Sequence, residues 1–290
     1  MNRPLKPRRS VLYMPASNDR ALEKARSLPA DALILDLEDA VAPDAKAAAR
    51  AAAVAAADSR SYGEREVVIR INGADTPWAA ADLDAVAHSA VDAILLPKVD
   101  GPEIVARTGR FLREAGSGAA LWVMAEIPVT VQLIDRIATA DPALQAIVMG
   151  LNDLAKALRV PKDPERAGLA HAMGACILAA RAQGLDILDG VYGDLDDEPG
   201  FVRECERARA LGFDGKTLIH PRQIATANAV FGVSADEAMR CEAIVAAWDR
   251  AASAGQGVAV LDGKMIEALH ADEARRVLAL HAAIQARAED

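Results

Sequence analysis

The sequence is poor in aromatic residues and contains no long apolar run. Only 3% of its 290 residues are aromatic although 52% are hydrophobic, so a buried core has to be built mainly from Ala, Leu, Val and Ile. No apolar segment reaches the roughly 20 residues that cross a bilayer. The basic start of the chain runs into VLYMPASND, which is more polar than the apolar core of a signal peptide. We therefore expect a cytoplasmic protein with no membrane partner.

Positive charge is also in short supply, because 33 Lys and Arg stand against 42 Asp and Glu, a formal net charge of −9. Nucleic acids require a basic surface, so none is expected as a partner. One local exception is a basic cluster near the start of the chain, which indicates either a solvated tail or a patch for an anionic ligand. The cluster comprises Arg3, Lys6, Arg8, Arg9, Arg20 and Lys24.

Cysteine is rare and widely spaced. Cys176, Cys205 and Cys241 form no Cys-x-x-Cys pair, which argues against a disulfide framework or a zinc site. Each lies in an Ala- and Arg-rich helical segment, where a free cysteine usually serves as a small core residue.

Eight short apolar runs alternate with longer segments that carry apolar residues at three- and four-residue spacing. Such runs are typical of strands buried on both faces of a parallel sheet. The expected strands lie at 10–16, 31–38, 66–72, 92–99, 120–127, 144–151, 185–191 and 215–221. Eight strands, each followed by a helix, predict a (β/α)₈ TIM barrel. An open, doubly wound sheet is the alternative, but no strand is followed by a Gly-x-Gly-x-x-Gly turn.

The pattern changes after about residue 232. Residues 234–255 read as a helix, 256–270 as a hairpin or extended loop, and 271–290 as a final helix. This tail is too small for an independent core. We therefore expect a barrel domain at 1–232 and a small helical lid or arm at 233–290.

Ionisable residues gather where the expected strands end, and the C-terminal ends of the strands carry the active site in a TIM barrel. Burying so many charges together is unfavourable unless they pair or hold a metal, so the set indicates a site more strongly than any single member does. The set comprises Asp36, Glu38, Asp39, Arg70, Asn72, Lys98, Glu126, Asn152, Asp153, Lys216 and His220.

Glu126 and Asp153 follow consecutive strands and have no histidine or thiolate neighbours. Two carboxylates suit Mg²⁺, which fills its remaining positions with water and substrate oxygens. Arg70 can hold a carboxylate or an oxyanion with two parallel hydrogen bonds. Lys98 has two interpretations, a Schiff-base nucleophile or a partner for a carboxylate or an anionic substrate.

The chain resembles the citrate lyase β-subunit family, which includes malyl-CoA, citramalyl-CoA and citryl-CoA lyases. The resemblance rests on motifs that follow in order from about residue 9 to about residue 275. They are RSVLYMPASNDR, ILDLEDAVAPDAKAAAR, VVIRING, LLPKV, AEIP, GLNDLA, GKTLIHPRQI and DGKMIEALH.

The resemblance implies a TIM barrel with a C-terminal lid and a homotrimer or a dimer of trimers. It implies Mg²⁺ held by Glu126 and Asp153, with Arg70 on the 2-oxo acid or its oxyanion and a CoA thioester as the other substrate. Glu38 and Asp39 would act close to the metal waters. The further substrate-binding positions that we expect, most of them on the CoA side, are Arg9, Arg20, Lys98, His220 and Pro221.

The tail motif differs from the family at one reacting position. The lyases have Met-Ile-Asp, with the Asp acting as acid or base on the acyl-CoA carbon, and this chain has Glu267 there. We expect a retro-Claisen cleavage, or the reverse condensation, with Glu267 as the acid. Two alternatives remain open: a metal-dependent 2-oxo-acid aldolase that does not use CoA, and a subunit of a citrate lyase complex.

Overall fold

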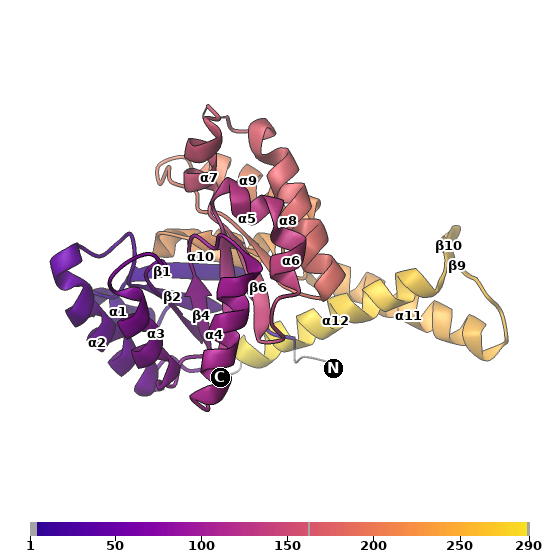
Figure 1. Ribbon diagram of the computed structural model, residues 1–290. Helices are drawn as coiled ribbons and strands as arrows, with labels where there is room; N and C mark the ends of the chain where they lie inside the picture. Colours follow the sequence, from indigo (N-terminus) through magenta and orange to yellow (C-terminus); the bar gives the residue numbers. More distant parts are fainter. Residues whose placement is uncertain (1–4, 162, 289–290) are drawn as a thin grey trace. The chain divides into compact units, whose positions relative to one another are not determined.

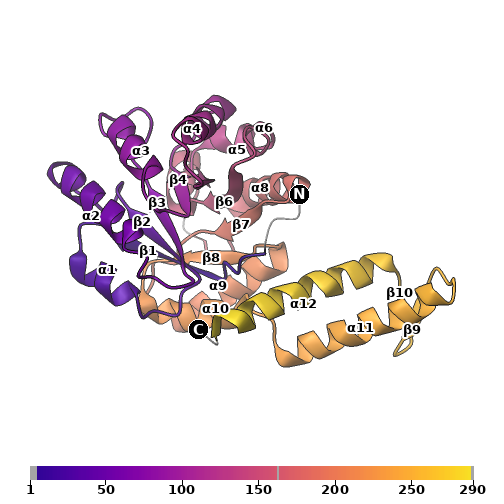
Figure 2. The same cartoon turned by 90° about the horizontal axis from the view of Figure 1, so that it is seen from below.

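Eight parallel strands close into a barrel in the computed structural model, which describes residues 5–161 and 163–288. Each strand pairs with the next along the chain, and β1 pairs with β8 to complete the ring (Figure 2). The strands are β1 (Ser10–Pro15), β2 (Ala32–Asp36), β3 (Glu66–Arg70), β4 (Ala93–Leu96), β5 (Ala120–Ala125), β6 (Leu144–Met149), β7 (Asp186–Asp189) and β8 (Gly215–Leu218). The predicted fold class and all eight strands are confirmed, with strand ends shifted by up to three residues.

Helices connect the strands and surround the ring (Figures 1 and 2). The Ala-rich segment forms α2 because alanine has the highest helix propensity. The α-helices of the barrel unit are α1 (Asp19–Ala25), α2 (Lys46–Asp58), α3 (Ala79–Ala87), α4 (Pro102–Glu114), α5 (Pro128–Gln132), α6 (Ile134–Ala138), α7 (Leu151–Leu158), α8 (Ala170–Gln183), α9 (Glu198–Leu211) and α10 (Ile224–Val230). Three single turns of 3₁₀ helix are η1 (Pro43–Ala45), η2 (Ala167–Leu169) and η3 (Pro221–Gln223).

Alternate residues of the strands fill the inside of the barrel, because side chains along a strand point to opposite faces. The buried interior cluster includes Ile34, Val68, Leu95, Trp122 and Val148. Trp122 is the largest of the fully buried side chains, in a sequence that has few aromatic residues. Two residues beyond Ile34 and Val68, the inward-facing positions of β2 and β3 hold the polar residues Asp36 and Arg70. The apolar core therefore ends where the candidate site begins.

The opposite end of the barrel is closed by Arg8. Its guanidinium lies 2.7 Å from Glu66 through Nε, also pairs with Asp186, and stacks 4.9 Å from the ring centroid of Trp122. Arg8 is 5% exposed and Glu66 2% exposed, so the charges are buried and paired. A Cβ on Gly215 would lie 1.9 Å from the carbonyl oxygen of Arg8, which explains why only glycine fits there.

The described residues divide into two compact units, the barrel at Arg8–Val230 and a second unit that comprises residues 5–7 and 231–288. In the second unit α11 (Ala235–Ser253) and α12 (Ala268–Ala288) lie side by side, with the strands β9 (Ala259–Leu261) and β10 (Lys264–Ile266) forming a hairpin between them (Figure 1). A small apolar cluster holds this unit together, made of Ile244, Ala247, Trp248, Ala251, Ala259, Leu261 and Ile266. The predicted helix, hairpin and helix of the tail are confirmed.

Cys176, Cys205 and Cys241 are free and buried, as expected for core residues. None of the helices within residues 5–161 and 163–288 is long and apolar enough to cross a membrane.

Candidate active site

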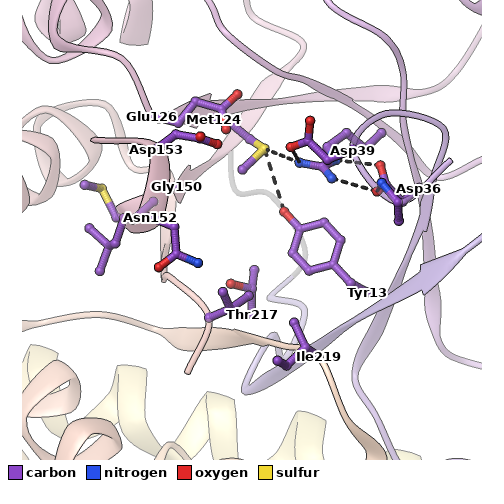
Figure 3. Close-up of a pocket in the computed structure, with 15 residues that line it drawn as sticks. Tyr13, Asp36, Asp39, Met124, Glu126, Gly150, Asn152, Asp153, Thr217 and Ile219 are labelled. Carbon is purple, nitrogen blue, oxygen red and sulfur yellow. Dashed lines mark hydrogen bonds and ion pairs between the residues drawn. The ribbon is translucent and has the colours of Figure 1, made fainter. Parts of the chain in front are cut away.

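A cavity of about 340 Å³ opens among the C-terminal ends of the barrel strands (Figure 3). Its charged lining consists of Asp36, Asp39, Arg70, Glu126 and Asp153. Its apolar lining consists of Ala40, Met124, Met149, Leu151, Val191 and Ile219. Strand alternation explains the charged set in part, because Asp36 and Arg70 end β2 and β3 as register partners and Glu126 follows β5 directly.

Arg70 is anchored by Asp36 through two parallel hydrogen bonds. Nε lies 2.6 Å from Asp36 Oδ1 and Nη2 lies 2.7 Å from Oδ2. Asp36 also accepts the backbone N–H groups of Glu38 and Ala40, at 2.9 and 3.0 Å, so it shapes the loop after β2 as well. Asp36 is 1% exposed and is therefore a structural partner of Arg70 rather than a free carboxylate.

The other side of the guanidinium faces weaker partners. Nη1 donates to the sulfur of Met124 at 3.6 Å and lies 3.0 Å from Glu38 Oε2 and 3.6 Å from Asp39 Oδ2. The contact with Glu38 Oε2 has ion-pair distance without hydrogen-bond geometry, and this oxygen is buried with no hydrogen-bond partner among the described residues. Thioether sulfur is a weak acceptor, so part of the guanidinium remains available for a ligand.

Lys98 lies on the Glu38 side of the site and is held there by ion pairs. Its ammonium group pairs with Glu38 and lies 3.5 Å from Asp39 Oδ1. Partial burial works to lower the pKa of Lys98, but the hydrogen bond and the charge of Glu38 outweigh burial and raise it to about 12. A lysine must lose its proton to attack a carbonyl, so the ion-pair interpretation of Lys98 is favoured over the Schiff base.

Glu126 lines the cavity and is fully buried. Its Oε1 accepts the backbone N–H of Lys98 at 2.7 Å, and that bond holds Lys98 in the left-handed backbone region at φ 49°. Its Oε2 is buried and has no hydrogen-bond partner among the described residues. Burial first, and then the nearby charge of Glu38, raise the pKa of Glu126 to about 7.

Gly150 brings the start of α7 against Glu126. A Cβ on Gly150 would lie 2.3 Å from the Cβ of Glu126 and 3.0 Å from its Oε2. Gly150 is the N-cap of α7 and makes no side-chain cap, and the first turn of the helix carries Asp153. Gly150, Leu151, Asn152 and Asp153 all line the cavity, so an uncapped helix N-terminus faces it.

The donor set fits a hard divalent cation. Figure 3 shows Glu126 and Asp153 on one side of the cavity, with Asp36 and Asp39 on the other. The described residues contain no group of three or more His, Cys, Asp or Glu side chains that could hold a metal. A pair of carboxylates, one with an unpartnered buried oxygen, suits Mg²⁺, which typically takes one or two protein carboxylates and leaves the other positions to water and substrate.

Tyr13 and Met124 are among the lining residues that the sequence did not identify. The hydroxyl of Tyr13 donates to the sulfur of Met124 at 3.7 Å, and the ring of Tyr13 lies 5.0 Å from the guanidinium carbon of Arg70. Burial raises the pKa of Tyr13 against the lowering effect of Arg70. Both residues lie inside strands and read as core in the sequence. Strand alternation could have identified them, because each lies two residues beyond an inward-facing core residue, Val11 or Trp122.

Not every predicted position reaches this cavity. Arg9 precedes β1, at the opposite end of the strands, where it pairs with Asp31 at 2.8 Å. Arg20 is exposed in the first turn of α1, on the same end of the barrel as the cavity. His220 and Pro221 follow β8 at that end, and His220 caps η3 by accepting the backbone N–H of Arg222 at 3.1 Å. Arg3 lies outside the described residues.

Glu267 belongs to the second compact unit, between β10 and α12. Its backbone N–H donates to His270 Nδ1 at 3.0 Å, and its carbonyl accepts the backbone N–H of His270, so the residue starts α12.

Lys216 lies in β8, and its ammonium group forms ion pairs inside the protein. It is fully buried and lies 2.8 Å from Asp189 and 2.6 Å from Glu204. Arg166 pairs with the same Asp189 at 2.7 Å. Thr217, the next residue, lines the cavity and donates to the carbonyl of Asp189 at 3.0 Å. The network fixes the ends of β7 and β8 behind the cavity wall.

Known proteins are similar to this chain over nearly its whole length. A (3S)-malyl-CoA thioesterase of Cereibacter sphaeroides (strain ATCC 17029 / ATH 2.4.9) is 48% identical over 280 residues, covering 97% of this chain and 96% of the relative. The citrate lyase subunit beta of Escherichia coli (strain K12) is 35% identical, covering 93% of this chain and 92% of the relative. Protein CitE from Mycobacterium tuberculosis, solved in complex with magnesium, acetoacetate and coenzyme A, has a TM-score of 0.74 at 29% identity and covers 94% of this chain and 97% of that chain.

The family comparison agrees with these relatives and confirms the resemblance seen in the sequence motifs. The HpcH/HpaI aldolase/citrate lyase family matches residues 9–221, the stretch that holds the barrel and its cavity. This protein is a member of the HpcH/HpaI aldolase/citrate lyase family.

Proposed function

We propose that this protein is a Mg²⁺-dependent enzyme that cleaves or forms a carbon–carbon bond in a 3-hydroxyacyl-CoA such as malyl-, citramalyl- or citryl-CoA. The observation that carries the proposal is a single cavity lined by the carboxylates Glu126 and Asp153 (Figure 3) and by Arg70, which Asp36 fixes with two hydrogen bonds. The magnesium, acetoacetate and coenzyme A bound by the Mycobacterium tuberculosis protein supply the chemical class of the ligands.

Glu126 and Asp153 are the residues that would hold the metal. A bound Mg²⁺ polarises a carbonyl oxygen and neutralises the charge that develops on it. The unpartnered Oε2 of Glu126 accounts for one ligand oxygen, and Asp153 in the first turn of α7 accounts for another.

Two groups of the chain suit the oxo-acid end of the substrate. The first-turn N–H groups of an α-helix have no partner within the helix and favour an anion. In α7 these groups belong to Leu151, Asn152 and Asp153, which line the cavity, so they would bind the carboxylate. The Nη1 side of Arg70 would bind the oxygen of the reacting carbonyl in place of the Met124 sulfur.

We assign the bond changes to carboxyl groups of the chain. In cleavage, a carboxylate of the Glu38–Asp39 pair takes the proton of the 3-hydroxyl group, the carbonyl of the 2-oxo acid forms, and the bond between C2 and C3 breaks. The electron pair stays on the acyl-CoA carbon as an enolate. Glu267 donates the proton that converts the enolate to acyl-CoA, an assignment that rests on the DGKMIEALH motif.

The CoA portion is assigned to the side of the cavity that carries Arg20, His220 and Pro221. Lys98 keeps Glu38 charged and in place by its ion pair and could also approach the substrate. Arg9 is left out of this set because Asp31 already pairs with it at the other end of the barrel. A homotrimer or a dimer of trimers is proposed from the family resemblance, and light scattering on the purified protein tests it.

A second candidate reaction is hydrolysis of the thioester, favoured by the 48% identity to a (3S)-malyl-CoA thioesterase. Both reactions would use the same site and the same substrate. They differ in products, because cleavage yields acyl-CoA and a 2-oxo acid while hydrolysis yields free CoA and a hydroxy acid.

The test is to incubate the purified protein and Mg²⁺ with malyl-CoA, citramalyl-CoA and citryl-CoA in separate reactions. Phenylhydrazine traps the 2-oxo acid and a thiol reagent reports free CoA, so one sample distinguishes the two reactions. Oxo acid in equal amount to acyl-CoA supports the proposal. Free CoA with a hydroxy acid and no oxo acid supports the second candidate, and absence of both products overturns both. An Asp153→Asn variant should be inactive in the same assay, and Asp135→Asn, an exposed position on α6, should match the wild type.

A further inference from the structure

We infer that the acceptor 2-oxo acid of this enzyme carries a single carboxylate, as in glyoxylate or pyruvate, and that the dicarboxylate oxaloacetate is discriminated against. The inference rests on the proposed function and specifies the substrate class of the same cavity. It concerns a choice on which members of the family differ, because the motifs of the chain are shared by malyl-, citramalyl- and citryl-CoA lyases.

The first argument is the charge of the lining. Among the described residues that line the cavity, four carboxylates stand against one cation. The carboxylates are Asp36, Asp39, Glu126 and Asp153, and the cation is Arg70. Mg²⁺ and one substrate carboxylate would use the metal pair and the start of α7, and the Nη1 side of Arg70 would bind the oxygen of the reacting carbonyl. No cation of this lining is then left for a second carboxylate.

The second argument is that the nearby cations are already paired. Arg70 gives two of its donors to the buried Asp36, at 2.6 and 2.7 Å. Lys98 pairs with Glu38 and approaches Asp39, and it is not part of the lining. The exposed carboxylate of Asp39 lies at the cavity and would repel a second anionic group.

The third argument is the nature of the remaining wall. Met124, Met149, Val191 and Ile219 present sulfur and hydrocarbon to the cavity. Such a wall accepts a hydrogen atom or a methyl group next to the oxo carbon. It gives a carboxylate no charged donor. The other side-chain donors of the lining are the hydroxyls of Tyr13 and Thr217, which already donate within the protein, and the neutral amide of Asn152. An anion buried without a cationic partner is strongly disfavoured.

Substrate preference is measured in the condensation direction, with Mg²⁺, excess acetyl-CoA or propionyl-CoA, and glyoxylate, pyruvate or oxaloacetate as the acceptor. Products are identified by the mass of the new CoA ester, so that pyruvate formed by decarboxylation of oxaloacetate is recognised by its own adduct. We expect kcat/KM for glyoxylate or pyruvate to exceed that for oxaloacetate by at least about tenfold, since like charges in contact are strongly unfavourable.

An added cation should reverse part of the preference. Ile219→Arg places a guanidinium in the wall and should raise the kcat/KM ratio of oxaloacetate to pyruvate by roughly tenfold. Leu178→Arg adds the same charge at an exposed position of α8 outside the lining and should leave the ratio unchanged.

The outcomes separate this inference from the proposed function. Oxaloacetate as the best acceptor in the wild type overturns the inference and leaves the lyase proposal intact. No adduct with any acceptor overturns the lyase proposal. In that case calorimetric titration of the three oxo acids into the Mg²⁺-loaded protein decides the inference, which fails if oxaloacetate binds as tightly as pyruvate or more tightly.

Discussion

Arg70 is held edge-on by Asp36, with Nε and Nη2 at 2.6 and 2.7 Å from the two carboxylate oxygens. The two residues end neighbouring strands and are register partners, so the pair is built into the barrel itself. The orientation of the guanidinium is therefore set before any substrate arrives. A donor fixed in advance stabilises developing charge without reorganising, which is the most effective form of electrostatic catalysis.

Arg70→Lys should behave almost as badly as Arg70→Ala in turnover, although it keeps the charge. A lysine ammonium cannot make the two parallel bonds to Asp36 while it also faces the substrate. The loss of one charge-assisted hydrogen bond corresponds to about 1.5–3 kcal/mol, or roughly ten- to a hundredfold in kcat/KM. Steady-state kinetics of both variants measure the effect, and near wild-type turnover in the lysine variant would show that Arg70 serves the fold alone.

Arg70→Ala should also lower the free energy of unfolding, by about 1–3 kcal/mol, because it leaves the carboxylate of Asp36, 1% exposed, without its partner. The double variant with Asp36→Asn removes the stranded carboxylate and should recover part of this stability without recovering turnover. Urea unfolding of the single and double variants separates the structural role of the pair from its role in the reaction.

Mg²⁺ binding should depend on Asp153 and Glu126 together. Asp153→Asn keeps the shape of the side chain but removes one negative charge from a two-carboxylate site, so the Mg²⁺ affinity should fall at least about tenfold while the fold persists. Isothermal calorimetry measures the affinity and circular dichroism the fold. Asp135→Asn on α6 serves as the matched control, and an unchanged affinity in Asp153→Asn would remove Asp153 from the site.

Gly150→Ala tests the close approach of α7 to Glu126. The new Cβ would lie 2.3 Å from the Cβ of Glu126, so one of the two must shift, and we expect the proposed metal ligands to move apart. We expect a loss of Mg²⁺ affinity of roughly tenfold or more together with a lower melting temperature. Gly174→Ala, in α8 with nothing within 4 Å of the added carbon, should be neutral or stabilising by up to about 1 kcal/mol. Equal behaviour of the two variants would contradict the packing argument.

The raised pKa of Glu126, at about 7, has consequences of opposite sign for folding and for metal binding. A carboxyl that titrates near 4.3 in the unfolded chain and near 7 in the fold stabilises the fold at low pH. That contribution is lost as the pH rises from about 4.5 to 7. The metal-free protein should therefore lose unfolding free energy over this range, of the order of 3 kcal/mol from this group.

Mg²⁺ requires the ionised carboxylate, so its affinity should rise as the pH passes through about 7. Denaturant unfolding at several pH values without Mg²⁺ measures the first effect and calorimetry the second. In Glu126→Gln both dependences should be weaker than in the wild type. An unchanged pH profile in this variant would assign the dependence to another group.

The barrel could be predicted because the periodicity of apolar residues and the local composition are visible in short stretches of sequence. Each strand is a short apolar run, and the charged residues that interrupt these runs mark strand ends, which placed Asp36, Arg70 and Glu126 at one end of the barrel. Closure of the barrel brings these strand ends together regardless of the conformation of the loops. Tyr13 and Met124 were missed because their positions within strands are indistinguishable from core in a single sequence.

The basic cluster at the start of the chain shows why long-range pairs are beyond sequence reasoning. Arg8 and Arg9 read equally well as a solvated tail or as an anion patch. In the fold Arg8 pairs with Glu66 and Asp186, which are distant along the chain, and Arg9 pairs with Asp31. Local sequence spacing does not identify these partners, since strand pairing and the closure of the barrel bring them together.

Glu267 supplies the last prediction, because the family resemblance implies Asp at this point of the tail motif and this chain has Glu. If the carboxyl protonates the acyl-CoA enolate, Glu267→Gln should lower kcat by at least about a hundredfold, within the usual contribution of general acid catalysis. Glu267→Asp keeps the function with one methylene less and should stay within about tenfold of the wild type. Mg²⁺ affinity should be unchanged in both, since Glu126 and Asp153 are the proposed ligands.

Exchange of solvent deuterium into acetyl-CoA isolates the proton transfer from the carbon–carbon step. Acetyl-CoA incubated in deuterium oxide with Mg²⁺ and pyruvate, followed by mass, should gain label with the wild type and with Glu267→Asp, but not with Glu267→Gln. Glu242→Gln, an exposed position on α11 in the same compact unit, is the matched control and should exchange normally. Normal exchange in Glu267→Gln would show that another group carries the proton and that the change from Asp to Glu in the tail motif is neutral for the chemistry.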